Sequence, residues 1–264
     1  MPQNRKFVNM TWSPAQYTKF EDERTRPVRD LVAQIPLLDA RHAVDLGCGP
    51  GNSTQVLLAR FPQAHVTGMD SSPQMIDAAK KRLPDVPFAV ADIATWQPPQ
   101  PQDVILSNAT LQWLPDHAAL MPRLIHMLAP GGCLAVQMPD NLDEPSHRLM
   151  REVAASGPWA SKLTQAAIAR AARQSADWYY RVLKPHAARG DVWITTYHHP
   201  LAGAAAIVEW FKSTGLKPYI DPLNAAERSD FLALYESEIA KAYPAQGDGT
   251  VLLPFPRLFF VAVR

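Results

Sequence analysis

Short apolar runs alternate with helix-like stretches through the middle of the chain, between residues 41 and 138. The apolar runs predict strands at Ala43–Leu46, His65–Met69, Phe88–Val90, Asp103–Ser107 and Gly132–Gln137. Helices are predicted between them at Gln74–Arg82 and His117–Leu128, and the apolar residues of the second fall on one face. This alternation is typical of βαβ units built on a parallel sheet.

The flanking segments complete the predicted architecture. Residues 140–190 break the alternation and are helix-rich, and the alternation resumes after them. The remaining predicted elements are helices at Pro27–Ile35, Ala204–Ser213 and Ala225–Ala242 and strands at Val192–Tyr197 and Leu258–Val263. We therefore expect an α/β fold with helices on both faces of the sheet. It would divide into an N-terminal segment with a candidate lid (1–39), a core (40–139), a helical cap insertion on the substrate side (140–190) and the C-terminal part of the core sheet (191–264).

The composition predicts a soluble globular protein. Of the 264 residues, 47% are hydrophobic and 19% are charged, which are ordinary values for a chain with a buried core. A formal net charge of +1 provides no basic surface for nucleic acid or an anionic membrane. No apolar stretch approaches the roughly 20 residues that span a bilayer, residues 1–9 lack the apolar stretch of a secretory signal, and two cysteines predict no disulfide. We expect a soluble cytoplasmic monomer.

The clearest motif is a glycine loop between the first strand and a helix that starts near Asn52. Glycines at positions 47, 49 and 51 would let a ligand lie against bare main chain, with Cys48 between the first two. The spacing is G-x-G-x-G and not the G-x-G-x-x-G of a dinucleotide pyrophosphate site. Asp45 at the strand end would repel a pyrophosphate but could anchor the ammonium group of a methionyl amino acid. The loop therefore favours S-adenosylmethionine over NAD, and a purely structural turn is the alternative.

Further polar residues follow the next strands at the same predicted edge of the sheet. Asp70, with Ser71 beside it, lies about 20 residues after the loop, where a Rossmann-type site places an acid on the ribose hydroxyls. Asp92 would accept a hydrogen bond from the adenine amino group while Ile93 lies against the ring. The alternative for both aspartates is a capping role. At the end of the fourth strand, the predicted contacts on the sulfonium side are Asn108 and Ala109, with Trp113 close behind.

These motifs together resemble the class I S-adenosylmethionine-dependent methyltransferases over residues 40–138. The resemblance rests on 45–51, Asp70, Asp92 and the Leu-Ala-Pro-Gly-Gly segment at 128–132. It implies a Rossmann-like sheet and this cofactor.

A narrower resemblance, to the trans-aconitate 2-methyltransferase family, extends over nearly the whole chain. It rests on Trp12-Ser13-Pro14 with Tyr17, Phe20, Arg24 and Arg26-Pro27, and on the segments 111–117, 213–218 and 255–259. It implies methylation of one carboxylate of trans-aconitate to a monomethyl ester. The segment at 111–113 also occurs in malonyl-carrier methyltransferases, so two alternatives stay open. One is a methyltransferase for another small or carrier-bound carboxylic acid, and the other is a non-catalytic protein that binds S-adenosylmethionine.

A carboxylate acceptor needs no general base. Its pKa is near 4, so it is ionised at neutral pH and attacks a methyl group without losing a proton. We therefore predict no catalytic side chain beyond positioning groups, and no metal. His198 and His199 directly follow a predicted strand, and as neighbours on an extended chain their rings point oppositely. We assign His199 to the substrate side, with a surface or packing role as the alternative.

A polycarboxylic acid requires cationic contacts, for which the planar fork of arginine is suited. Arg257 stands before the apolar run 258–263, where an unpaired charge would be costly, so it is the first candidate, with an internal salt bridge as the alternative. Residues 140–190 hold eight Lys and Arg against five Asp and Glu, which makes Arg148 and Arg181 further candidates. Arg24 is another, and for all three a solvated surface charge is the alternative. Trp12 and Tyr17 complete the predicted substrate contacts as a lid, with packing of an N-terminal segment as the alternative.

Overall fold

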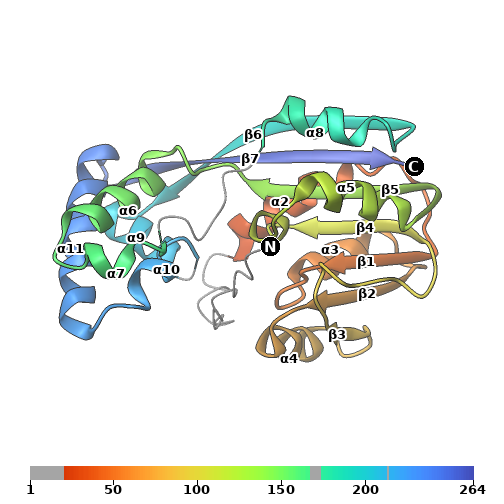
Figure 1. The fold of residues 1–264 in the computed structure, drawn as a ribbon, viewed down its shortest axis with the longest axis horizontal. Helices are drawn as coiled ribbons and strands as arrows, with labels where there is room; N and C mark the ends of the chain where they lie inside the picture. Colours follow the sequence, from red (N-terminus) through yellow and green to blue (C-terminus); the bar gives the residue numbers. More distant parts are fainter. Residues whose placement is uncertain (1–20, 167–173, 213) are drawn as a thin grey trace, which may run out of the picture.

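The computed structural model describes residues 21–166, 174–212 and 214–264, which contain a seven-stranded mixed sheet (Figure 1). The strand order is β3-β2-β1-β4-β5-β7-β6. The five strands of the predicted βαβ region run parallel, and β7 is antiparallel to both of its neighbours. The strands are β1 (His42–Leu46), β2 (His65–Asp70), β3 (Phe88–Val90), β4 (Gln102–Asn108), β5 (Leu128–Pro139), β6 (Arg189–Leu201) and β7 (Val251–Val263).

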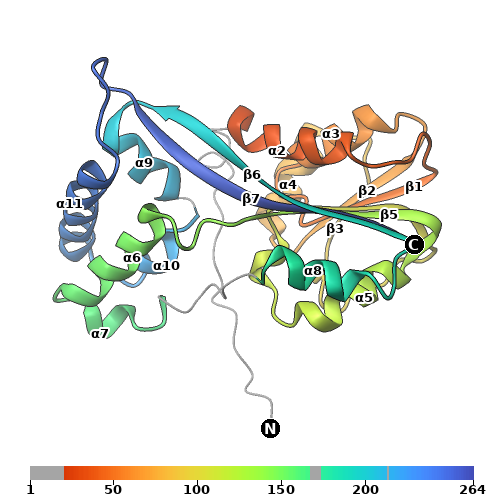
Figure 2. The same ribbon diagram turned by 90° about the horizontal axis from the view of Figure 1, so that it is seen from above.

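Helices cover both faces of this sheet, as Figure 2 shows. On one face, α2 (Glu21–Ala33) and α3 (Asn52–Arg60) pack on the central strands. On the other face lie α5 (His117–His126) and α8 (Ala176–Leu183). Helix α4 (Pro73–Arg82) packs at the β2–β3 end, and Ser72 caps it by accepting a hydrogen bond from the amide of Met75.

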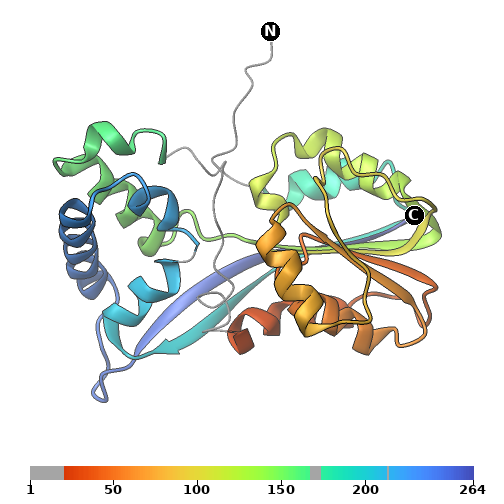
Figure 3. The ribbon, with the colours of Figure 1, turned by 90° about the horizontal axis from the view of Figure 1, so that it is seen from below.

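The other helices form a separate hydrophobic core beside the sheet, which we call the helical unit. Its members are α6 (Pro145–Ser156), α7 (Ala160–Leu163), α9 (Gly203–Lys212), α10 (Lys217–Ile220) and α11 (Ala225–Ala242). The ends of β6 and β7 extend into this core, so that the two strands join the helical unit to the sheet (Figures 1 and 3).

The helical unit differs from the predicted cap at 140–190. Helix α8 lies within those residues but packs on the sheet, where Tyr179 stacks on Phe260 with ring centroids 5.4 Å apart. Helices α9 and α11, which we assigned to the core sheet, instead pack against α6. The helical unit is therefore assembled from two stretches of the chain.

Strands β6 and β7 are longer than the sequence predicts. The predicted strands are too short because the outer halves contain prolines, which usually indicate the end of a strand. Pro254 on β7 pairs with His198 of β6. It lies beyond the end of β5, whose last pair with β7 is Pro139 with Arg257. A proline is tolerated there, because one side of the strand needs no ladder hydrogen bond.

Candidate functional site

The glycine loop connects β1 to α3 at the carboxyl edge of the parallel strands. Gly47, Gly49 and Gly51 all have positive φ, at 73°, 54° and 89°, a region that favours glycine. A Cβ on Gly47 would lie 2.2 Å from Cγ2 of Thr110, so the turn after β4 packs directly on this glycine. A Cβ on Gly49 would meet no described atom within 4 Å. Gly47 is thus required by packing, whereas Gly49 borders open space.

The N–H groups of this loop are used within the protein. Those of Gly47 and Cys48 donate to the carbonyl of Met69, that of Gly51 donates to the carbonyl of Cys48, and that of Gly49 donates to Asp70. The Cys48 side chain is buried, and burial raises the pKa of its thiol. The loop therefore offers a ligand close approach to the main chain and not a set of free donors.

Asp45 lies beneath the loop with its side chain fully buried. Its Oδ2 accepts hydrogen bonds from Ser53 Oγ at 2.6 Å and Thr54 Oγ1 at 2.7 Å, at the start of α3. Its Oδ1 has no hydrogen-bond partner among the described residues. Burial raises the pKa of Asp45 to about 6. Asp45 holds the loop to α3, and its contact with an ammonium group stays a prediction.

The raised pKa of Asp45 predicts a specific dependence of stability on pH. Because the folded pKa of about 6 exceeds the ordinary pKa of 3.8 for an aspartate side chain, the folded state holds more protons than the unfolded state between these two pH values. This group therefore lowers the free energy of unfolding as pH rises through that window, by about 3 kcal/mol in full. Asp45→Asn keeps an acceptor for both hydroxyls but cannot ionise.

We expect the free energy of unfolding of Asp45→Asn, relative to wild type, to rise between pH 4 and pH 7. Urea unfolding at several pH values measures the difference, and other titrating groups cancel in the comparison. If the difference in the free energy of unfolding between the variant and the wild type does not change with pH, the raised pKa of Asp45 is contradicted.

Asp70 joins the end of β2 to the glycine loop. Its Oδ2 accepts from the N–H of Gly49 at 3.0 Å and its Oδ1 from the N–H of Ser72 at 2.8 Å. Burial raises its pKa. Asp70 thus lies beside the loop and holds the turn before α4, whose cap is Ser72 and not Asp70. The ribose contact stays a prediction. Ser71, next to it, is exposed.

Asp92 and Ile93 follow β3 at the same edge. Asp92 is exposed, and its Oδ1 accepts from the N–H of Ala94 at 2.8 Å, which caps the turn. Ile93 is buried within the core on the α5 face. The adenine contacts remain predictions, with the capping alternative visible in the structure.

The end of β4 has an unusual backbone. Ala109 has a φ of 52°, which is uncommon for a residue with a side chain. Its N–H donates to the carbonyl of Gln137 at 2.9 Å, and its carbonyl accepts from Gln112 Nε2 at 2.6 Å. Such strain persists only where surrounding contacts impose it, and it concentrates at functional sites.

The short helix η1 (Leu111–Trp113) is held by a histidine from the next element. His117 Nε2 lies 2.8 Å from the carbonyl of Leu111, and its Nδ1 lies 2.6 Å from the hydroxyl of Tyr179. Because the carbonyl can only accept, Nε2 carries the hydrogen and Nδ1 accepts from the tyrosine. Burial lowers the pKa of His117, which favours this neutral form.

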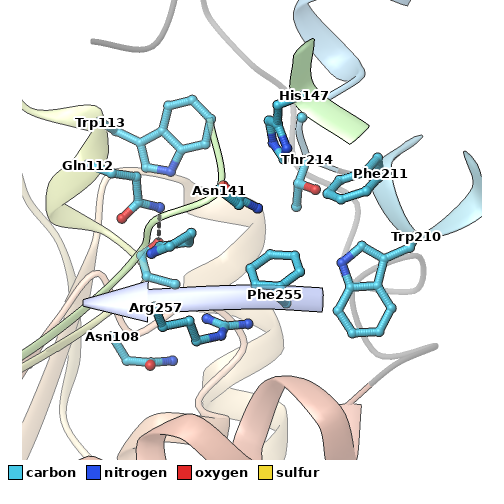
Figure 4. A pocket seen from close by; sticks show the side chains of 13 residues that line it. Asn108, Gln112, Trp113, Asn141, His147, Trp210, Phe211, Thr214, Phe255 and Arg257 are labelled. Atoms are coloured by element: carbon cyan, nitrogen blue, oxygen red, sulfur yellow. Dashed lines mark hydrogen bonds between the residues drawn. The ribbon is translucent and has the colours of Figure 1, made fainter. Parts of the chain in front are cut away.

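A cavity of about 680 Å³, its open mouth included, lies between this edge of the sheet and the helical unit (Figure 4). Both bodies supply its walls. The lining residues are Asn108, Ala109, Gln112, Trp113, Pro139, Asn141, His147, Trp210, Phe211, Thr214, Gly215, Phe255 and Arg257. Three predicted contacts therefore meet here from the cofactor side, and Arg257 meets them from the substrate side.

Arg257 is the buried cation of the cavity, with 4% of its surface exposed. Its Nη1 donates to Gln137 Oε1 at 3.1 Å, and its guanidinium lies over the ring of Phe255 at 4.6 Å. Both contacts hold the planar group in a fixed orientation. The structure thus places this predicted residue where a carboxylate could reach it.

The other predicted substrate contacts do not line the cavity. Arg148 pairs with Glu152 and Arg181 with Asp177, and each arginine side chain is more than half exposed. These assignments need correction, because i,i+4 ion pairs hold both groups on the outer surface. Trp12 and Tyr17, and the side chain of Arg24, lie outside the described residues.

His199 also lies outside the lining, although its ring does point inward. It is buried and stacks on Trp210 with centroids 4.7 Å apart, whereas His198 is exposed. Burial, followed by the charge of Arg257, lowers the pKa of His199 to about 4. His199 therefore supports the aromatic wall from behind and is a weak base.

Sequence reasoning missed much of the lining, above all Gln112, Asn141, His147 and the aromatic wall of Trp210, Phe211 and Phe255. A signal was nevertheless present. The segments 111–117, 213–218 and 255–259, on which the family resemblance rests, each supply residues to this one cavity.

Across the described residues, no helix is long and apolar enough to cross a membrane. The described residues also contain no cluster of three or more His, Cys, Asp or Glu side chains that could bind a metal ion.

Comparisons with known proteins agree with this geometry. Residues 43–132 match the family model described as "Methyltransferase domain". The chain is 57% identical over 255 residues to a trans-aconitate 2-methyltransferase of Methylobacterium radiotolerans, covering 95% of this chain and 97% of the relative. It is also 57% identical over 255 residues to the enzyme of that name from Sinorhizobium fredii, covering 97% and 99%.

Solved structures show the same fold at low sequence identity. The YcgJ protein from Bacillus subtilis aligns with a TM-score of 0.59 at 12% identity, covering 90% of this chain and 98% of that one. The phosphoethanolamine N-methyltransferase 2 of Haemonchus contortus, solved with S-adenosylhomocysteine, gives 0.55 at 16% identity, covering 90% and 52%. These likenesses confirm the predicted α/β Rossmann-like fold.

Proposed function

Since the chain belongs to the trans-aconitate 2-methyltransferase family, as its sequence predicts, we propose that it methylates one carboxylate of trans-aconitate with S-adenosylmethionine. The observation that carries this proposal is the buried Arg257 in a cavity that the strained end of β4 also lines. The next residue, Thr110, packs on Gly47 of the glycine loop. The expected product is a monomethyl ester.

The glycine loop supports S-adenosylmethionine as the methyl donor. A pyrophosphate is held by several free N–H groups, but the N–H groups of this loop are already used. The open space beside Gly49 would instead admit the methionyl part. Oδ1 of Asp45 and Oδ1 of Asn108 are buried acceptors with no partner among the described residues. Such acceptors suit the positively charged end of this donor.

The reaction requires positioning more than proton transfer. The bound donor supplies an electrophilic methyl group on a sulfonium. A carboxylate oxygen forms the new C–O bond as the C–S bond breaks, so the sulfonium charge and the carboxylate charge disappear together and no proton moves. Holding the reacting groups in line is worth up to roughly 7–11 kcal/mol. We assign that task to Arg257 and the aromatic wall of Trp210, Phe211 and Phe255, which would also exclude water.

The net charge of the chain is +1, which offers no extended basic surface for a nucleic acid or an anionic membrane. This charge supports a small acid as the partner. We propose that the protein acts on it as a cytoplasmic monomer. Light scattering that gave the mass of a dimer would contradict the monomer.

A panel of acids tests the substrate. Release of S-adenosylhomocysteine is measured with trans-aconitate, with the saturated acid tricarballylate, with citrate and with a malonyl carrier protein. We expect trans-aconitate to have the highest kcat/KM by at least tenfold, because a flat conjugated acid can pack against the aromatic wall. Higher kcat/KM for the carrier-bound acid would favour that alternative, and turnover of none with tight donor binding would favour a non-catalytic binding protein.

A further inference from the structure

The cavity has two walls of different origin, and each contributes one side chain that can carry positive charge. Arg257 comes from β7 in the sheet, and His147 comes from α6 in the helical unit. Figure 4 shows the two on opposite sides of the cavity. Of the described lining residues that the helical unit and its connecting turns supply, His147 is the one that can be protonated to a cation.

We infer that His147 is a specificity-determining residue that donates a hydrogen bond to a carboxylate of the acid other than the one methylated. This inference rests on the proposed function. An acid with three carboxylates presents one to the methyl group and one to Arg257, and a third remains. Burying that group without a partner is unfavourable, so a donor on the opposite wall would stabilise the bound acid.

Two tyrosines form hydrogen bonds with the main chain in the first turn of α6 and so fix the position of His147. The N–H of Ser146 donates to the hydroxyl of Tyr243 at 3.0 Å, and the hydroxyl of Tyr235 donates to the carbonyl of Ser146 at 2.9 Å. Both tyrosines belong to the C-terminal part of α11 or directly follow it. Such support from neighbouring contacts is what an oriented binding group needs.

The ring of His147 is also fixed. It is buried, with 5% of the residue exposed, and packs edge-on against Phe211 with centroids 4.9 Å apart. Its Nδ1 lies 3.3 Å from Ser146 Oγ. In the tautomer in which Ser146 donates to Nδ1, Nε2 carries the hydrogen and can donate to a carboxylate.

Gly215 leaves space at the donor atom. A Cβ on this glycine would lie 3.1 Å from His147 Nε2 and 3.3 Å from Cε of Met150. Both Gly215 and His147 line the cavity, so a side chain at position 215 would press on the nitrogen that we assign as the donor.

The inference is tested by combining two sets of changes. One set removes single carboxylates from the substrate, and the other removes the imidazole of His147 from the protein. The acids are trans-aconitate and three dicarboxylates that each lack one of its carboxylates, namely mesaconate, itaconate and (Z)-glutaconate. The variants are His147→Phe, which has no donor, and His147→Gln, which keeps one. The matched control is His198→Phe, which removes an exposed imidazole.

We expect His147→Phe to raise KM for trans-aconitate at least tenfold with kcat changed less than threefold, because the contact is made equally in the ground state and the transition state. His147→Gln should recover most of the loss, and His198→Phe should match wild type. For the one dicarboxylate that lacks the bound carboxylate, KM should change less than twofold in His147→Phe.

Two results would overturn the inference while leaving the proposed function intact. They are an unchanged KM for trans-aconitate, and an equal rise in KM for all four acids, which a merely structural histidine would give. If the wild-type protein methylates none of these acids, the proposed function itself is contradicted. If His147→Phe does not fold, Gly215→Ala provides the same test, because its methyl group displaces Nε2 without removing it.

Discussion

Arg257→Lys should lower kcat/KM for trans-aconitate at least tenfold, a loss of about 1.4 kcal/mol or more in transition-state stabilisation. The substitution keeps the charge but removes the planar fork that binds a carboxylate through two hydrogen bonds. It also removes the stacking on Phe255 and the bond to Gln137 that orient the group. Arg257→Met, which removes the charge as well, should cost at least a hundredfold. Steady-state kinetics with trans-aconitate measures both.

The matched control is Arg181→Lys, because that arginine is 69% exposed and pairs with Asp177 on the outer surface. We expect its kcat/KM to equal that of wild type. Affinity for S-adenosylmethionine should stay constant in all three variants. Full activity in a folded Arg257→Lys would make Arg257 structural, and a parallel loss of donor affinity would place the acceptor site elsewhere.

Gly49→Ala should reduce the affinity for S-adenosylmethionine at least thirtyfold, or about 2 kcal/mol. In the protein without ligand, the added methyl group meets no described atom within 4 Å, and φ at this position is 54°. The variant should therefore fold with only the strain of a left-handed alanine, about 1–2 kcal/mol. It loses affinity because its methyl group occupies the space that we assign to the donor. Isothermal titration calorimetry measures the change.

Gly249→Ala separates this effect from backbone strain. Gly249 has a φ of 82° and equally open surroundings, but it lies in the loop before β7. Its alanine variant should lose similar stability and keep full affinity for the donor. Equal affinities of the two variants would show that the space beside Gly49 is not the donor site.

The features that the sequence predicted well are those that neighbouring residues determine. The glycine loop, the strand before it and the start of α4 at Ser72-Pro73 are each decided within about ten residues, by backbone freedom, apolar runs and capping. Arg257 was also predictable, because a charge beside a long apolar run must be buried with a partner or a ligand.

The features that it missed depend on contacts between distant parts of the chain. Helix α6 packs against α9 and α11, which begin more than fifty residues after α6 begins, so the helical unit could not be assigned from one stretch. His147 reaches the cavity only through that packing. The error over Arg148 and Arg181 was avoidable, because Glu152 and Asp177 stand four residues away on the same helices, the spacing of surface ion pairs.

The most direct test of the proposed function follows the methyl group itself. The protein is incubated with trans-aconitate and S-adenosylmethionine labelled with ¹³C in its methyl group, and the product is identified by ¹³C NMR and mass spectrometry. We predict one labelled O-methyl ester resonance, a mass one ¹³C-labelled methylene above that of trans-aconitate, and one S-adenosylhomocysteine released per ester. Label that stays in the donor, or that enters the acid on carbon, while both ligands bind would contradict carboxylate methylation by this protein.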